Sequence, residues 1–297
     1  MYKLRDWVNI NDLNIDQLSN IPEAVPLYFE PIINNLNRLI LNSLCLNPNA
    51  VYIFENPNHK DKINWHYLSQ NPNAIHILEK NIDKIDWFML CQNPNAIPII
   101  EKHLDKIIWE SLCFNPNAIQ LIEKNLDKIN WKSLSSNPNA IHLLEKNIKY
   151  IDWFSLSNNS NAIHLLEKNL EKIDWLILNL NPNAMPILEK NLDKIYWPYL
   201  CENPNAIPLL EKNLDKIDWK FLSRNPNALK LLEKNTELIS WFLLSANSCI
   251  FELDYMGIKE RCSIFKEELI QKSLHPNRII KYLNEGYGID EITENFF

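Results

Sequence analysis

Residues 71–92 of the chain read Asn-Pro-Asn-Ala-Ile-His-Ile-Leu-Glu-Lys-Asn-Ile-Asp-Lys-Ile-Asp-Trp-Phe-Met-Leu-Cys-Gln. Asn-Pro-Asn-Ala begins again at positions 93, 115, 137, 181, 203 and 225, and Asn-Ser-Asn-Ala fills the gap at 159. Successive starts lie 22 residues apart. Self-similarity at a fixed period of this length is typical of stacked repeat proteins, in which each unit contacts its neighbours. The pattern therefore predicts an array that grows by repetition.

Each unit is expected to form two short helices. In the unit that starts at Asn71, apolar residues follow one another at helical spacing. We expect Asn73 to cap the first helix and Asn81 to end it in a left-handed conformation. Asp86 should then cap a second helix that carries Trp87 and ends near the next Asn-Pro-Asn-Ala.

The prolines agree with this division. Pro98, Pro186 and Pro208 each lie three residues after the expected cap, in the first turn, where a missing N–H costs no helical hydrogen bond. Helices of about 6–9 residues are unstable alone, so every unit should bury its apolar side chains against the next one. In the unit at Asn71 the expected core residues are Ile75, Ile77, Leu78, Ile82, Ile85, Trp87 and Leu90.

The expected fold is therefore all-α, an α-solenoid of short helical hairpins with a 22-residue period. A leucine-rich-repeat-like solenoid is the alternative, because its repeat length and recurring Asn are similar, although the Leu alternation of its strand is missing here. We expect a divergent N-terminal cap in residues 1–46, nine units in 47–246 and a C-terminal cap in 247–297. Both ends should face water, and the segment Leu4-Arg5-Asp6-Trp7 resembles the end of a unit.

Composition excludes several classes of function. The formal net charge of -7 gives no general attraction to nucleic acid or anionic membranes. No apolar run approaches the roughly 20 residues of a membrane span. Residues 1–256 contain no glycine, which excludes glycine-rich phosphate loops there. None of the six cysteines forms a Cys-x-x-Cys pair, so a reducing compartment is expected.

The recurring polar residues suggest structural roles and not catalysis or metal binding. Four cysteines share the position four after Trp (or Leu41) with serines, which indicates a small packing residue and no nucleophile. His76, His142 and His164 share a second position, and neighbouring units are about 10 Å apart, too far for a shared metal. The tryptophans are expected to pack in the core and not to stack on bases. No catalytic residue, metal site or cofactor is predicted.

The first and fifth residues after each Trp vary from unit to unit. They are spaced i and i+4, so they should share one face of the second helix, and stacked units would join them into what we call the variable ribbon. Phe154, Leu176 and Leu180 would form an apolar patch, a common mark of interaction sites, and Lys220 with Arg224 a basic spot. The candidate binding residues of the ribbon are Phe88, Glu110, Phe114, Lys132, Phe154, Asn158, Leu176, Leu180, Glu202, Lys220 and Arg224.

The repeat unit Asn-Pro-Asn-Ala-Ile…Leu-Leu-Glu-Lys-Asn…Asp-Lys-Ile-Asp-Trp resembles repeats of uncharacterised proteins from giant DNA viruses of the mimivirus type. The segment Phe265-Lys266-Glu267-Glu268-Leu269-Ile270 and the following His275-Pro276-Asn277-Arg278 resemble a stretch near the C-termini of such proteins. The resemblance covers roughly residues 47–283. It implies a viral protein in the host cytoplasm or viral factory, and it implies no biochemical activity.

Together these observations predict a non-enzymatic scaffold that binds another protein, viral or host, through the variable ribbon. The alternative is a solenoid that binds single-stranded nucleic acid with one nucleotide per unit, and the acidic balance argues against it. A membrane partner is not expected. Residues 247–297, where glycine reappears, show no nucleophile–base or metal pattern that would indicate an enzyme.

Overall fold

The computed structural model describes residues 2–25, 38–263, 275–285 and 288. The chain forms two compact units: Leu4–Ile250, which we call the repeat body, and a second unit of Met1–Lys3 with Phe251–Phe297. The segment 265–270, part of the resemblance to viral proteins, lies outside the described residues.

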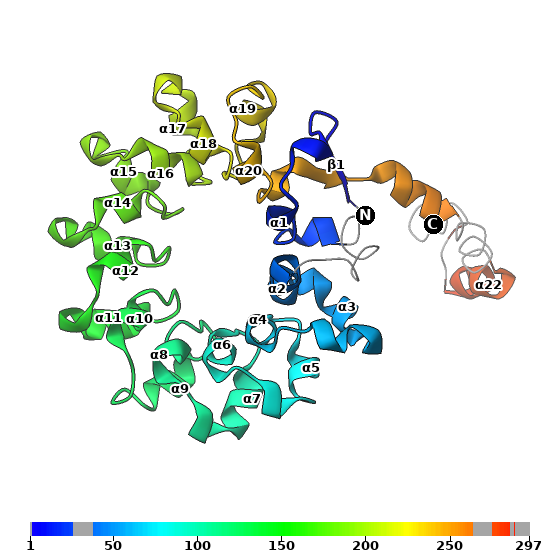
Figure 1. The fold of residues 1–297 in the computed structure, drawn as a ribbon, viewed down its shortest axis with the longest axis horizontal. Helices are drawn as coiled ribbons and strands as arrows, with labels where there is room; N and C mark the ends of the chain where they lie inside the picture. Colours follow the sequence, from blue (N-terminus) through cyan, green and yellow to red (C-terminus); the bar gives the residue numbers. More distant parts are fainter. Residues whose placement is uncertain (1, 26–37, 264–274, 286–287, 289–297) are drawn as a thin grey trace. The chain divides into compact units, whose positions relative to one another are not determined.

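The repeat body is built from two rows of short helices, visible in Figure 1 as an inner and an outer series. Each helix of the inner series begins at a tryptophan, and we call this series the Trp row. Its members are α4 (Trp65–Gln70), α6 (Trp87–Gln92), α8 (Trp109–Leu112), α10 (Trp131–Ser135), α12 (Trp153–Ser157), α14 (Trp175–Leu178), α16 (Trp197–Glu202), α18 (Trp219–Leu222) and α20 (Trp241–Leu244). The outer row contains α3 (Val51–Glu55), α5 (Ile75–Leu78), α7 (Ile97–Lys102), α9 (Ile119–Glu123), α11 (Ile141–Lys146), α13 (Ile163–Glu167), α15 (Met185–Leu188), α17 (Ile207–Glu211) and α19 (Leu229–Glu233).

Short 3-10 helices connect or precede the α-helices. The sequence did not indicate them, because segments of three to six residues are too short to show a periodicity. They are η1 (Ile10–Asp12), η2 (Pro22–Ala24), η5 (Pro48–Ala50), η6 (Pro57–Lys62), η7 (Ile82–Lys84), η8 (Leu104–Lys106), η9 (Ile148–Tyr150), η10 (Leu170–Lys172), η11 (Leu192–Lys194), η12 (Leu214–Lys216) and η13 (Ser248–Ile250).

The helix caps are partly those expected. Asp86 caps α6, since its Oδ1 accepts a hydrogen bond from the Met89 amide at 3.1 Å. Asn73 does not cap α5, which starts after Ala74; instead Asn71 Oδ1 accepts from the Asn73 amide at 2.9 Å. Asn81 is not left-handed either (φ -138°, ψ 49°), because its side-chain amide reaches back to the Ile77 carbonyl at 2.8 Å. The chain thus turns without a left-handed residue at this point.

The first Asn of each Asn-Pro-Asn-Ala joins neighbouring units through a ladder of buried hydrogen bonds. Asn93 Nδ2 donates to the carbonyls of Ser69 at 3.0 Å and Asn71 at 2.9 Å, while its Oδ1 accepts from the Asn95 amide at 3.0 Å. Equivalent bonds recur at every unit up to Asn247. An aspartate lacks the two donors, so the geometry requires asparagine.

The other residues of the motif also have defined roles. The second Asn extends to the preceding unit, as in the 2.9 Å bond from Asn95 Nδ2 to the Pro72 carbonyl. Because this bond uses only a carbonyl, Ser160 can replace proline, and it accepts from Asn183 at 2.9 Å. The alanine, for example Ala96, is fully buried.

Of the core expected for the unit at Asn71, Leu78, Ile85 and Leu90 are buried, whereas Ile75 and Ile77 are half-buried. Leu78 and Leu90 are fully buried as predicted, but all nine tryptophans of the Trp row are only half-buried. Ile82 is also half-buried, and its apolar equivalents in the later units are exposed, with Leu104 and Leu192 each 57% accessible. The units therefore pack through small and medium residues close to the backbone, and the larger side chains lie at the edges.

The all-α solenoid is confirmed and the leucine-rich-repeat alternative is wrong. Among the described residues, strands occur only as β1 (Tyr2–Leu4) and β2 (Phe251–Leu253), which form one two-stranded sheet. The second unit also contains α22 (Pro276–Asn284), whose N-cap His275 accepts a hydrogen bond from the Asn277 amide at 3.3 Å. Neither strand lies in a repeat, so the Trp-bearing segments are helical throughout.

The two ends of the repeat body contact each other, contrary to the expectation that both face water. The N-terminal segment contains α1 (Ile15–Leu18) and is followed by α2 (Arg38–Leu46). The Asn14 amide donates to Ser245 Oγ, at the end of the last unit, at 2.8 Å. On the other side of α1, Asn47 Nδ2 donates to the Ser19 carbonyl at 3.0 Å.

These bonds place α1 in line with the Trp row, between α20 and α2, although α1 begins at Ile15 and not at a tryptophan. Asn14 holds the position of Asp86, because its side chain accepts from the Gln17 amide at 3.0 Å as an N-cap. Trp7 does not take the place of a repeat tryptophan; its ring lies 6.2 Å from that of Trp241. The series of units is thus closed, and we call the contact between Leu4–Val25 and Trp241–Ile250 the seam.

Candidate functional site

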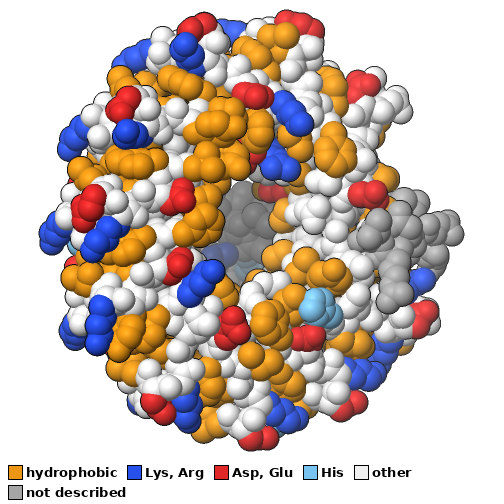
Figure 2. Space-filling view, turned by 60° about the vertical axis from the view of Figure 1, so that its left-hand side comes forward, with side chains coloured by type: hydrophobic (Ala, Val, Ile, Leu, Met, Phe, Trp, Pro, Cys, Tyr) orange, Lys and Arg blue, Asp and Glu red, His pale blue; other side chains and the backbone are white. Residues whose placement is uncertain are grey.

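The variable ribbon lies on the exposed surface of the Trp row. The residue directly after Trp is exposed in eight of nine units, Pro198 being half-buried. Among the apolar members, Phe154 is 56%, Leu176 45% and Phe242 53% accessible. Figure 2 shows apolar side chains mixed with acidic and basic ones over the surface of the repeat body. The ribbon therefore offers large apolar side chains to a partner.

The structure places all the candidate residues of the ribbon as follows. Phe88, Glu110, Phe114, Lys132, Phe154, Asn158, Leu176, Lys220 and Arg224 are exposed, whereas Leu180 and Glu202 are half-buried. The fifth position often lies beyond the helix: α14 ends at Leu178, and α18 ends at Leu222. In such units the two positions share a surface without sharing a continuous helix, whereas α4, α6 and α16 contain both positions as expected.

Ribbon residues of consecutive units do contact each other. Gln70 Nε2 donates to Gln92 Oε1 at 3.3 Å. Arg224 Nη1 forms an ion pair with Glu202 Oε1 at 3.3 Å. The expected basic spot of Lys220 and Arg224 is therefore reduced, because Arg224 is paired with a carboxylate.

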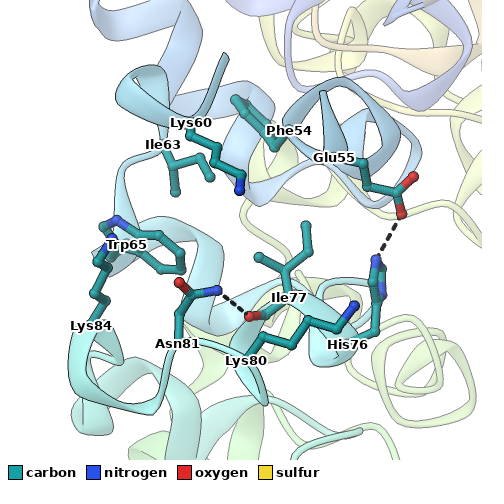
Figure 3. Close-up of a pocket in the computed structure, with 10 residues that line it drawn as sticks. All are labelled: Phe54, Glu55, Lys60, Ile63, Trp65, His76, Ile77, Lys80, Asn81 and Lys84. Carbon is teal, nitrogen blue, oxygen red and sulfur yellow. Dashed lines mark hydrogen bonds and ion pairs between the residues drawn. The ribbon is translucent and has the colours of Figure 1, made fainter. Parts of the chain in front are cut away.

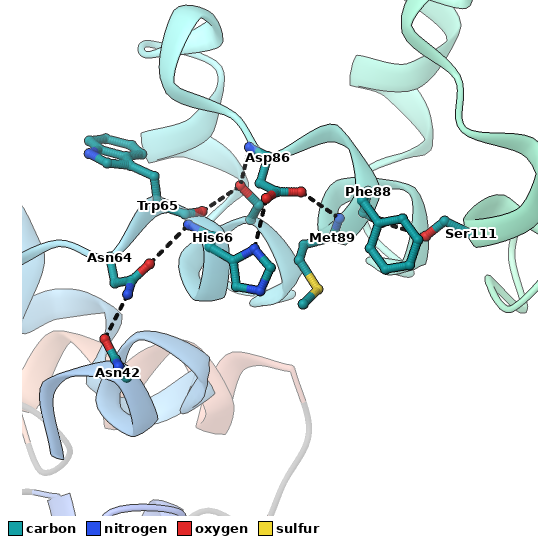
Figure 4. Close-up of polar contacts among 9 residues, drawn as sticks. Asn42, Asn64, Trp65, His66, Asp86, Phe88, Met89 and Ser111 are labelled. Atoms are coloured by element: carbon teal, nitrogen blue, oxygen red, sulfur yellow. Dashed lines mark hydrogen bonds and ion pairs between the residues drawn. The ribbon is translucent and has the colours of Figure 1, made fainter. Parts of the chain in front are cut away.

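A polar cluster occupies the N-terminal part of the ribbon, around His66 (Figure 4). His66 Nδ1 lies 2.7 Å from Asp86 Oδ2, and Ser111 donates through its hydroxyl to the Phe88 carbonyl. Burial acts to raise the pKa of the Asp86 carboxyl, but hydrogen bonds from His66 and the Met89 and Phe88 amides, with the charge of His66, hold that pKa below its ordinary value. These bonds fix the orientation of ribbon residues by contacts between units.

In five units, a side chain of the following unit lies over the tryptophan ring. Lys84 Nζ lies 5.0 Å from the Trp65 ring centre, and lysines stand in the same way over Trp87, Trp109 and Trp153. At Trp131 the lysine is replaced by Tyr150, which stacks on the ring at 5.1 Å with an interplanar angle of 18°. These are cation–π and stacking contacts between units, and each covers one face of its tryptophan ring.

The cysteine and serine position has a structural role. Ser157 Oγ donates to the Trp153 carbonyl at 2.7 Å and accepts from the Asp174 amide of the next unit at 3.0 Å. Cys201 Sγ accepts the equivalent amide, from Asp218, at 3.4 Å. Burial raises the pKa of Cys45 and Cys201 to about 11, so both thiols remain protonated at neutral pH.

The histidines of the outer row pair with carboxylates of the preceding unit. His142 Nε2 lies 2.7 Å from Glu123 Oε1, and His164 and His76 make the same contact with Glu145 and Glu55. Within the part of the chain that the structure describes, no group of three or more His, Cys, Asp or Glu side chains could hold a metal ion. The same residues include no helix with the length and apolar content that crossing a membrane requires.

The chain matches no protein-family model, no curated protein and no solved structure. The fold and the ribbon therefore stand on the geometry of this structure alone.

Proposed function

We propose that the protein is a non-enzymatic scaffold that binds another protein through the variable ribbon. One observation supports this most directly. The ribbon carries different residues in successive units, and large apolar ones among them, such as Phe154 and Leu176, are exposed although they have no place in the core. Exposed apolar side chains set among polar ones commonly mark protein contacts.

The rigid backbone under the ribbon supports the same proposal. The asparagine ladder and the buried leucines hold each unit in one position relative to the next. Binding across several units would then reduce the conformational freedom of the partner but hardly that of the scaffold. This small ordering cost favours affinity.

The ribbon can be tested with a pair of matched leucines. Leu176→Asp changes a ribbon residue, and Leu192→Asp changes a similarly exposed leucine in η11, outside the ribbon. Partners are captured on the wild-type protein and quantified by mass spectrometry, and circular dichroism checks the fold of each variant. We expect Leu176→Asp to reduce recovery of the captured partners at least about tenfold, the effect of losing a contact near the centre of an interface. Leu192→Asp should leave recovery unchanged.

Equal losses in both variants, or no loss in Leu176→Asp, would contradict the ribbon assignment. Binding of single-stranded nucleic acid is the competing function. The lysine and tyrosine side chains that cover one face of each of five tryptophans argue against a continuous stack of bases along the Trp row. Retention of single-stranded RNA on a filter at low salt, abolished by charge reversal at Lys220, would favour that competing function.

The resemblance of the repeat to those of giant DNA viruses leads us to propose a viral protein that acts in the host cytoplasm or viral factory. Affinity purification from infected cells would identify viral or host partners. Recovery of the protein only from uninfected host cells would contradict this origin.

A further inference from the structure

A cavity of about 470 Å³ lies between the unit Asn47–Gln70 and the next one. This unit has 24 residues, two more than the others, and the extra residues fall between Glu55 and His59. Its 3-10 helix η6 spans six residues, whereas the equivalent η7 spans three. The cavity thus occurs where the repeat is irregular, and its volume is within the range of small-molecule sites, roughly 300–1,000 Å³.

Apolar and basic side chains together line the cavity. Ile63, Trp65 and Ile77 line it together with Phe54, which is only 1% accessible (Figure 3). The side chain of Lys60 extends from η6 toward the space between Phe54 and Ile77 (Figure 3). A ligand here would contact aliphatic side chains and the part of the Trp65 ring that Lys84 leaves uncovered.

Three lysines, Lys60, Lys80 and Lys84, supply the positive charge. No carboxylate among the described residues forms an ion pair with any of the three; Lys84 instead lies over the Trp65 ring. The carboxylate that lines the cavity, Glu55, is held by His76 at 2.7 Å. Three ammonium groups against one carboxylate leave a local positive charge in a chain whose formal net charge is -7.

The next unit provides an internal comparison. The equivalent cavity there, lined by Glu79, Ile82 and Lys102 among others, measures about 310 Å³. Ile82 stands 22 residues after Lys60 and takes its place, and the following units carry Ile or Leu at that position as far as Leu214. Lys60 is therefore one of the residues that distinguish the first cavity from the second, together with Asn81, whose place His103 takes.

We propose that this cavity binds a small organic phosphate monoester with a flat ring, such as a nucleoside monophosphate. A phosphate monoester carries nearly two negative charges at neutral pH, which matches the excess of ammonium groups, and lysine binds phosphate as a point charge. The ring of the ligand would lie against Ile63, Ile77 and the part of the Trp65 ring that Lys84 leaves uncovered. This site is separate from the variable ribbon and independent of the scaffold function.

Isothermal titration of the full-length chain with adenosine 5′-monophosphate tests the proposal, with adenosine and inorganic phosphate as the two partial probes. We expect the monophosphate to bind at least about tenfold more tightly than either partial probe, since each provides only half of the contacts. Lys60→Ala should weaken monophosphate binding about tenfold, the loss expected for one charged hydrogen-bond donor. Lys102→Ala, at the equivalent of Lys80 one unit later, is the matched control and should bind like the wild type.

Absence of heat with the monophosphate up to about 10 mM, or binding that Lys60→Ala leaves unchanged, would overturn the proposal. Equal weakening by Lys102→Ala would show nonspecific attraction to surface lysines and would overturn it as well. If adenosine binds as tightly as the monophosphate, the lysines make no contribution to binding, and the proposal is overturned in this case too. Lys60 is exposed, so its substitution should leave the circular dichroism spectrum unchanged; Lys60→Glu, a second variant, should abolish binding.

Discussion

Two kinds of contact hold the repeat body together: the regular contact between consecutive units, and the seam between the first segment and the last unit. Both contain the same amide-to-serine bond, from Asp174 to Ser157 at 3.0 Å inside the array and from Asn14 to Ser245 at 2.8 Å at the seam. They differ at the ladder. The residue of α1's unit that corresponds to the ladder asparagine is Ile21, which is buried but has no side-chain donor.

Other contacts take the place of the missing ladder bonds at the seam. Arg5 donates through Nε to the Cys249 carbonyl at 2.8 Å and through its backbone amide to the Ile250 carbonyl at 3.0 Å. The Trp7 and Trp241 rings lie 6.2 Å apart. Side-chain contacts thus replace ladder bonds where the chain is not continuous between neighbours. The comparison teaches that the seam is the contact most open to local separation, because loss of its few bonds does not require adjacent units to unfold.

The largest difference between the two regions should appear when equivalent core leucines are truncated. Leu156→Ala, in α12, should lower the free energy of unfolding by about 3 kcal/mol, because it leaves a cavity between units on both sides. Leu18→Ala, in α1, should lower it less, since the seam can separate while the array remains folded. Urea denaturation followed by circular dichroism measures both. Equal losses would mean that the seam is as cooperative as the internal contacts.

Substitutions at the ladder position should show how the seam, which has Ile21 in place of the ladder asparagine, differs from the internal contacts. Asn137→Ala removes the donors to the Cys113 and Asn115 carbonyls and should cost about 2 kcal/mol. Ile21→Asn would place an amide where the ladder pattern provides carbonyl acceptors, so its cost should stay below about 1 kcal/mol. Ile187→Asn, a buried position outside the ladder, is the control and should cost about 3 kcal/mol because its amide would be unpaired. An Ile21→Asn variant as unstable as Ile187→Asn would contradict the assignment of Ile21 to the ladder position.

The smallest effect should be local opening of the seam after Arg5→Ala. Burial raises the pKa of Cys249 to about 11, and the charge of Arg5 acts to lower it. Removing Arg5 would therefore raise this pKa further and slow thiol alkylation, whereas opening of the seam would speed it. We expect faster alkylation of Cys249, by about fivefold, measured by peptide mass spectrometry in a Cys262→Ser background. The rate at Cys201, inside the array, is the control and should not change; slower labelling of Cys249 would show a closed seam.

Much of the local structure could be predicted from the sequence. The 22-residue period, the two helices per unit and the Asp86 cap all depend on residues within one unit, where spacing and capping preferences are sufficient. The variable ribbon was also predicted as a series of positions, and the contacts of Gln70 with Gln92 show that these positions are neighbours.

Other features depended on neighbouring units. A half-buried Trp87 and an exposed Leu104 have the same apolar pattern as core residues, so the sequence could not show which side of the hairpin faces the next unit. The role of the first Asn as a ladder residue was missed because its partners lie in the preceding units. A signal for the seam was present: Asn14, Leu18, Ser19, Pro22 and Ala24 have the same spacing as Asp86, Leu90, Cys91, Pro94 and Ala96.

By itself, then, the sequence determined that the chain is a helical repeat with a fixed unit and a row of variable residues, because those properties follow from short-range spacing. Only the tertiary structure decided that Asn14 meets Ser245, that the tryptophans lie at the edge, and that the irregular unit opens a cavity beside Lys60. The physical reason is that the turn between one unit and the next is small and accumulates over the whole array. No single repeat encodes where that accumulated turn brings the two ends.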